Sequence, residues 1–306
     1  SVVGSQAVLD RLFGSEHSPA EASWEPIPFN QTKAKRTAQG ISDKQHVIVA
    51  EAQQHENRII PAMWTALQVL GDAVILQAAG HVEYDETKIQ KENQDSVLAQ
   101  NLNLENQLEG MQQLVGQAEA DSPLGLDQPF FANHEVWRNF RVGITTRNMN
   151  LQTSKIHRFM FFRPEWASTI RMDEDSNVEH FKVALAAAFG IKTDQQPNAQ
   201  TVEMFDVMLA KADNRIVDLA MKLHADIQNP DSPLLSQEEK SAIGTLSAGK
   251  EGMQTLQAMV ALGIYLDAMV QGKEDFTVHL LVGVDGKTNG PILSHLALGA
   301  AASPEE

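Results

Sequence analysis

Cysteine is absent from the 306 residues of this sequence. Its absence excludes disulfide bonds, a thiolate nucleophile and any zinc site built on cysteine. Ten histidines are present, but none of them lies at a spacing typical of zinc ligands. Disulfide-stabilised proteins, thiol enzymes and zinc-finger proteins are therefore excluded as classes.

Long hydrophobic runs are also lacking. No apolar stretch approaches the roughly 20 residues that a membrane-spanning helix needs, and the first residues lack the charged start and long apolar stretch of a signal peptide. Hydrophobic residues nevertheless make up 42% of the chain, which is enough for a real core. The length suits one large domain or two small ones, and we expect no membrane partner.

Positive charge is scarce overall but locally concentrated. The chain has 24 lysines and arginines against 40 acidic residues, a net charge of −16, which argues against a protein coated in nucleic acid. From residue 138 to residue 171, however, Glu165 is the only acid, and the segment carries seven basic residues: Arg138, Arg141, Arg147, Lys155, Arg158, Arg163 and Arg171. Such a tract on an acidic body favours a focused nucleic-acid channel, because phosphate contacts need only local basic side chains. The alternative is a solvated loop whose charges pair with the acidic remainder.

The segment that begins at Phe276 contains the most informative pattern. Its apolar residues alternate with period two, which predicts a buried strand: Phe276, Val278, Leu280, Val282 and Val284. Asp285 ends the strand, Gly286 permits a tight turn, and an apolar run suited to a helix follows Gly290. A carboxylate placed in this way suits Mg²⁺, which usually takes one or two carboxylates and leaves its other positions to water and substrate phosphates.

Two other interpretations of this turn compete with a metal site. Gly286-Lys287-Thr288 would end a phosphate-binding P-loop only if a glycine stood five residues before that core, where the chain has Leu281. The simpler alternative is an Asp-Gly hairpin turn without chemistry. The local sequence does not decide between that turn and a metal site.

The run Val284-Asp285-Gly286-Lys287-Thr288-Asn289-Gly290-Pro291 resembles motif A of the single-subunit, T-seven-like phage RNA polymerases. The branch that it resembles most is that of the N-four-like bacteriophages. In that family the aspartate binds the catalytic magnesium ions, and the carbonyl group of the next glycine assists. The resemblance therefore implies Mg²⁺ as cofactor, Asp285 as the catalytic metal ligand and Gly286 as its helper.

The basic tract is similar to the start of the palm in the same family. Asn150-Leu-Gln152-Thr-Ser-Lys155 resembles the family's Asn-Pro-Gln turn and the lysine that follows it. The family's preceding Gly-Arg pair is missing, so either Arg141 or Arg147 would take its place. An arginine suits this position because its planar fork grips phosphate oxygens and stays charged. The resemblance implies nucleic-acid contacts at Arg141, Arg147, Lys155 and Arg158, and we interpret His157 as structural or phosphate-contacting.

The hydrophobic periodicity predicts an α+β chain that is predominantly helical. It indicates helices near residues 42–57, 61–80, 85–120, 177–189, 201–228, 237 onward and 251–271. We expect three parts: a lead-in at 1–60, a helical thumb-like region at 61–125 and a partial palm containing motif A at 126–306. The resemblance makes 85–120 the thumb, and a helical hairpin in a bundle is the alternative.

The family's second catalytic aspartate, in the His-Asp turn of motif C, and its motif B both lie beyond motif A. Neither stands before Glu306, and the sequence contains no His-Asp pair. We therefore expect one subunit, or a fragment, of a DNA-directed RNA polymerase, completed by a second polymerase subunit that carries motifs B and C. DNA template, RNA product, nucleoside triphosphates and a single-stranded-DNA-binding accessory protein are the other implied partners, in the cytoplasm of an infected bacterium. The alternatives are a non-catalytic helical scaffold and a DNA-binding accessory protein derived from a polymerase.

Overall fold

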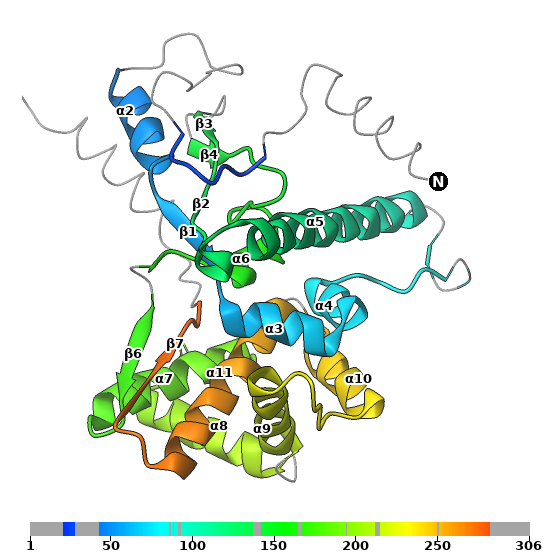
Figure 1. The fold of residues 1–306 in the computed structure, drawn as a ribbon. Coiled ribbons are helices and arrows are strands. Elements are labelled where there is room, and N and C mark those ends of the chain that lie inside the picture. The colour runs from blue at the N-terminus through cyan, green and yellow to red at the C-terminus, as the bar shows by residue number, and fades with distance from the viewer. Residues whose placement is uncertain are drawn as a thin grey trace, which may run out of the picture.

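The computed structural model describes residues 21–27, 43–85, 87, 89–90, 93–136, 142–164, 167–193, 195–211, 215–249 and 251–281. Helices predominate among them, and the strands are short and pair antiparallel (Figure 1). The predicted α+β, predominantly helical class is confirmed.

Five short strands form what we call the strand-rich region, in the upper half of Figure 1. One sheet has the order β2-β1-β5, and β3 pairs with β4. The strands are β1 (Glu56–Ile59), β2 (Phe130–Phe131), β3 (His134–Val136), β4 (Val142–Ile144) and β5 (Phe161–Phe162). A 3-10 turn, η3 (Gly125–Asp127), precedes β2, and the short helix α6 (His157–Met160) precedes β5.

The first described helix is shorter than predicted. α2 (Asp43–Ala52) ends five residues before Asn57, which lies in β1 instead. Strand pairing on both sides holds β1, and the buried Asn57 side chain donates a hydrogen bond to the carbonyl oxygen of Phe130 at 3.3 Å. These partners lie far away in the sequence, so local periodicity does not reveal them.

The predicted core helix at 61–80 is two helices. α3 (Pro61–Leu70) and α4 (Asp72–Ala79) meet at an angle of 112°. Gly71 joins them with φ +84°, a conformation that favours glycine. The bend lets both helices bury apolar faces in the same core, which one straight helix would not do.

The long helix α5 (Gln94–Asp121) crosses the molecule above α3 and α4 in Figure 1. Its apolar side chains are buried only over the C-terminal part, at Leu104, Leu108, Met111, Leu114, Val115 and Ala118. Leu98 and Leu102 are exposed, at 45% and 39%. The helix contains no lysine or arginine, so it offers no cation to a phosphate.

The lower half of the molecule is the helical body, made of the helices α7 (Asp175–Ala188), α8 (Asn198–Lys211), α9 (Arg215–Gln228), α10 (Gln237–Leu246) and α11 (Gly252–Gln271). The predicted helix at 201–228 is described in two parts, α8 up to Lys211 and α9 from Arg215, and residues 212–214 between them lie outside the described residues. α9 packs closely on α11 at Gly263, where an added Cβ would lie 2.5 Å from the carbonyl oxygen of Ala220. Beside the body, β6 (Ser168–Arg171) pairs with β7 (Asp275–Val278).

One helix of the body is longer and more apolar than we predict from the sequence. Within the described residues, α11 is long and apolar enough to cross a membrane, and α3 with α4 would qualify as one bent pair. The prediction that no stretch reaches this length is therefore wrong. Because 61% of the relevant window of α11 is buried inside the molecule, the apolar composition serves the core.

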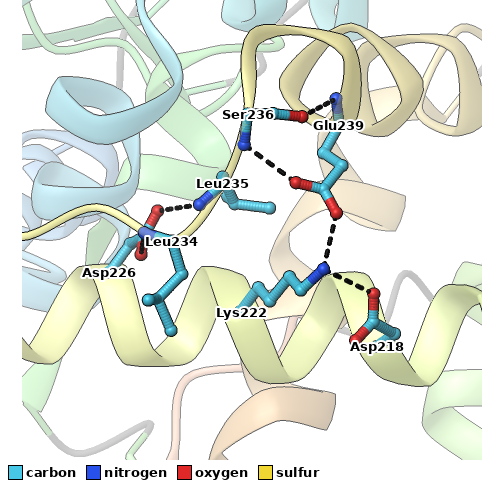
Figure 2. Close-up of polar contacts among 7 residues, drawn as sticks. All are labelled: Asp218, Lys222, Asp226, Leu234, Leu235, Ser236 and Glu239. Atoms are coloured by element: carbon cyan, nitrogen blue, oxygen red, sulfur yellow. Dashed lines mark hydrogen bonds and ion pairs between the residues drawn. The ribbon is translucent and has the colours of Figure 1, made fainter.

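A polar clasp joins α9 to α10 across the intervening loop (Figure 2). The fully buried carboxylate of Asp226 accepts hydrogen bonds from the backbone N–H groups of Leu234 and Leu235. Ser236 is the N-cap of α10: it exchanges hydrogen bonds with Glu239 in a capping box.

The same clasp contains an ion-pair chain. Lys222 of α9 lies between two carboxylates, at 2.6 Å from Glu239 and 3.0 Å from Asp218 (Figure 2). The hydrogen bond from Lys222, followed by those from Ser236, lowers the pKa of Glu239 to about 2. The loop is therefore tied to both helices that it connects.

Candidate functional site

A pocket of about 330 Å³ lies where the strand-rich region meets the end of β7. We call it the first pocket. Its cationic side chains are Arg158 and Arg163, and the described residues place no carboxylate in its lining. The other lining residues come from β1, the segment before β3, the end of β4, the loop after it, β5, α11 and the chain beyond β7: Asn57, Ile60, Ala132, His134, Ile144, Leu151, Gln152, Phe161, Phe162, Gln257, His279, Leu280 and Leu281.

The Asn150–Lys155 segment, which carries the predicted nucleic-acid turn, is held against β4 by two amide side chains. Asn150 donates to the carbonyl oxygen of Ile144 at 2.9 Å and accepts from the N–H groups of Gln152 and Thr153 at 3.1 and 3.0 Å. Gln152 accepts from the N–H of Ile144 at 2.8 Å and donates to the carbonyl oxygen of Val142 at 3.3 Å. The amides take the place of a pairing strand, which is why the turn needs these two residue types.

His157 ties the turn to α5 through hydrogen bonds of its imidazole. Its imidazole is fully buried; Nδ1 accepts from the N–H of Asn150, and Nε2 lies 2.9 Å from the carbonyl oxygen of Gln107 in α5, so Nε2 carries the proton. Burial lowers the pKa of His157 to about 4. Of the two predicted roles, the structural one is therefore confirmed, because a buried neutral imidazole does not reach a phosphate.

Arg158 is positioned by the same turn. Its guanidinium donates to the carbonyl oxygens of Leu151, at 3.2 Å, and Gln152, and it lines the first pocket. Two of its five N–H groups are used in this way. The remaining donors are available to an anionic ligand in the pocket.

The predicted basic contacts do not converge on one site. Arg147 lines a different pocket, and the ammonium of Lys155 lies 3.6 Å from where a Cβ on Gly80 would stand, at the end of α4. Arg141 lies outside the described residues. Among the described members of the set, Arg158 alone lines the first pocket.

β7 leads the chain into the first pocket. Phe276 and Val278 are buried and Asp275 and Thr277 are exposed, so the predicted alternation is confirmed over these four residues. His279, Leu280 and Leu281 then line the pocket. Asp285 and Gly286 follow four and five residues after Leu281 and lie outside the described residues, as does the rest of the predicted turn.

Gln257 of α11 fixes this end of β7, and sequence reasoning missed it. Its side chain is 2% exposed; it accepts from the N–H of Leu281 at 2.7 Å and donates to the carbonyl oxygen of Phe159 at 3.1 Å. It therefore links α6, which follows the turn, to the segment that precedes Asp285. A lone amide on the apolar face of 252–271 was the available signal, because a buried amide needs hydrogen-bonding partners.

Two histidines that sequence reasoning also missed line the first pocket. Burial lowers the pKa of both His134 and His279 below the ordinary value of 6.5. The His279 ring packs on Phe162 with a centroid distance of 4.2 Å. Both imidazoles are thus neutral at pH 7, and the positive charge of the lining comes from arginine.

The described lining suits the phosphates that accompany Mg²⁺ better than the ion itself. Among the described residues, no group of three or more histidine, aspartate and glutamate side chains is placed to hold a metal. In the first pocket Arg158 offers guanidinium N–H groups to an anion, whereas the side-chain amides of Asn57, Gln152 and Gln257 already bond backbone groups. The described lining contains no carboxylate ligand for Mg²⁺.

Residues 44–161 match the family model for a virion DNA-directed RNA polymerase domain. The matched segment runs from α2 into β5 and includes the Asn150–Lys155 turn, His157 and Arg158. A comparison with curated proteins finds no significant match. The family-model match supports a relationship to the RNA polymerases of bacteriophages. It ends before β7, so the motif A resemblance lies outside it.

Proposed function

We propose that this chain forms part of the active centre of a phage DNA-directed RNA polymerase, acting inside the infected bacterium. The observation that carries the proposal is the first pocket. There Arg158, held by the Asn150–Lys155 turn, lines the same cavity as Leu281, four residues before Asp285. The family-model match over 44–161 supports this proposal independently of motif A.

Each residue near the first pocket would have a distinct role. Asp285 would hold Mg²⁺, with the carbonyl oxygen of Gly286 as a second ligand. Arg158 would bind a phosphate of the nucleic acid or of the incoming nucleotide through its free N–H groups. Gln257 would fix the position of the segment after β7 relative to Arg158, because its side chain bonds Leu281 on that segment and Phe159 next to Arg158.

Bound Mg²⁺ would neutralise charge on the triphosphate and activate the attacking hydroxyl group, so that no protein nucleophile is needed. The chain's own contribution is then positioning. The apolar side chains of buried Phe161 and half-buried Leu280 would limit water near the reacting phosphates. The second aspartate and the nucleotide-selecting helix, motifs C and B, would come from a second polymerase subunit.

α5 is our candidate for the thumb, and the region 126–306 for the partial palm. Because α5 has no basic residue, it would steady the nucleic acid by shape and not by phosphate contact. It also supports the turn: Gln107 of α5 bonds Ser154 at 2.7 Å and His157 at 2.9 Å. The thumb would thus set the position of the palm segment.

The test is Mg²⁺-dependent RNA synthesis on single-stranded DNA, by the chain alone and with the polypeptide that co-purifies from the native source. We expect activity only in the complex, and its loss in Asp285→Ala while assembly persists. Asp275→Ala is the matched control, an exposed carboxylate on β7 that should leave activity unchanged. Synthesis that survives Asp285→Ala would overturn the proposal and leave the non-catalytic scaffold.

A further inference from the structure

A second pocket, of about 300 Å³, lies between the segment 21–24, α5 and the loop 147–148. It shares no lining residue with the first pocket. Its main functional side chains are one aromatic, one cation, one carboxylate and three amides: Trp24, Arg147, Glu21, Gln113, Gln117 and Asn148. The volume is at the lower end of the range of about 300–1,000 Å³ for small-molecule sites.

The segment that carries Trp24 is held against the rest of the chain by hydrogen bonds. Ser23 exchanges two backbone hydrogen bonds with Phe131 of β2, at 3.0 and 2.8 Å. Gln128 donates to the carbonyl oxygen of Trp24 at 3.3 Å, and the N–H of Ala22 donates to the buried Asn148 side chain at 2.8 Å. The backbone around the indole is thus fixed before any ligand arrives, which lowers the entropic cost of binding.

The cation of this pocket is uncommitted. Arg147 is exposed and pairs with no carboxylate within the part of the chain that the structure describes. The amide of Gln117 lies on the α5 wall, and Gln113 uses one N–H on Glu109 at 3.1 Å. Amides donate and accept, so these groups match the edge of a nucleobase. The lining therefore combines an aromatic face, a phosphate-binding cation and edge-reading groups.

We propose that the second pocket binds an unpaired nucleotide of a single-stranded nucleic acid. The base stacks on Trp24, its phosphate pairs with Arg147, and its edge meets Gln117 and Asn148. Glu21 at the rim accepts from an N–H group of the base, such as N3–H of thymine. Stacking on an aromatic side chain tolerates any base, because every base has a π-face. The choice of a nucleic acid as ligand rests on the proposed function, whereas the pocket and its chemistry do not.

This assignment gives the predicted basic contacts two separate places. Arg158 serves the first pocket, and Arg147 holds the strand at a second point, on the other side of the Asn150–Lys155 turn along the chain. Two anchored points define the path of a flexible strand better than one. On this proposal Arg147 does not take the place of the family's active-site arginine. It acts together with Trp24 in the second pocket.

The test measures binding of a short fluorescent oligothymidylate to the full chain, by anisotropy, without catalysis. We expect Trp24→Ala to weaken binding about tenfold, as for loss of one stacked base, and Trp24→Phe to retain it. Arg147→Ala should weaken binding and reduce the slope of log K against log salt by about 0.7. Lys211→Ala, an exposed cation at the end of α8, is the charge control and should change little.

An abasic oligonucleotide of the same length should bind the wild type and Trp24→Ala equally. Equal binding of the base-containing strand to both proteins, or no binding of it at all, would overturn the proposal. Competition by thymidine monophosphate separates the two sources of the ligand: displacement that depends on Trp24 means that a free nucleotide also fits. Asp285→Ala should bind as the wild type does, so a failure of the catalytic proposal stays distinguishable from a failure of this one.

Discussion

The helical body and the strand-rich region are held together by different forces. In the body, α11 at Gly263 lies close to the backbone of α9 at Ala220, and the interior is apolar. In the strand-rich region the strands are two to four residues long, and amide side chains complete their hydrogen bonds, as Asn150 and Gln152 do on β4. The body should therefore respond to changes of volume, and the strand-rich region to the loss of single polar atoms.

The largest effect should come from added volume in the body. Gly263→Ala would place a Cβ 2.5 Å from the carbonyl oxygen of Ala220 and 2.8 Å from the Cβ of His224. Because backbone and not a flexible side chain must move, we expect a loss of about 3 kcal/mol in the free energy of unfolding, measured with denaturant. Gly116→Ala in α5 is the control: nothing lies within 4 Å of its added Cβ, and the helix should gain a little stability. Equal effects at both glycines would contradict the close approach of α9 and α11.

The next effect tests the strand-rich region through pH. The pKa of His157 is about 4 in the folded chain and about 6.5 when unfolded, so the unfolded state binds the proton first. His157 therefore contributes stability above pH 6.5 that is lost as the pH falls toward 4, at most about 3 kcal/mol. Unfolding measured across this range should show the dependence in the wild type and a smaller one in His157→Gln, because burial also lowers the pKa of His134, His224 and His279. His180→Gln, at an exposed position of α7, should keep it.

Removing one buried amide should uncouple the two regions. Gln257→Leu replaces the amide with an apolar side chain of similar size. It leaves the N–H of Leu281 and the carbonyl oxygen of Phe159 without their partner. We expect a loss of about 2 kcal/mol in unfolding free energy, and reduced RNA synthesis by the assembled enzyme because the segment before Asp285 is released. Gln254→Leu, which removes one bond to Leu281 from a part-buried position, should cost less. A fully active Gln257→Leu would show that this link does not position the active centre.

The smallest effect concerns a polar group in the helical body. Ser236→Ala removes the N-cap of α10 and should lower the free energy of unfolding by about 1 kcal/mol. Ser241→Ala, at an exposed position inside the same helix, should be neutral or slightly stabilising. If both serines behave alike, the capping box contributes nothing, and the clasp rests on Asp226 and on the ion pairs of Lys222.

Local signals in the sequence predicted the helices of the body well. α7 ends before Gly190, α10 begins after Ser236, and α11 fills the predicted 251–271. These features depend on residues within one or two turns of each other. The break at Gly71 was missed because periodicity continues across it, and tertiary packing decides whether a helix bends.

The candidate site was predictable only in outline. The alternation along 275–278 and the pattern of the Asn150–Lys155 turn are visible in the sequence. Gln257 was missed because its two partners lie 24 and 98 residues away in the chain. Asp285 and Gly286 remain predictions, as does the contact of Arg141.

The sequence by itself determined the helical class, the alternation of the strand at 275–278 and a basic tract on an acidic body. These properties follow from periodicity and charge, which neighbouring residues encode. The tertiary structure alone decided that Arg158 and Arg147 line different pockets, and that Trp24, more than a hundred residues away, belongs with Arg147. Side-chain direction depends on which segments pack together, and no local pattern along the chain contains that information.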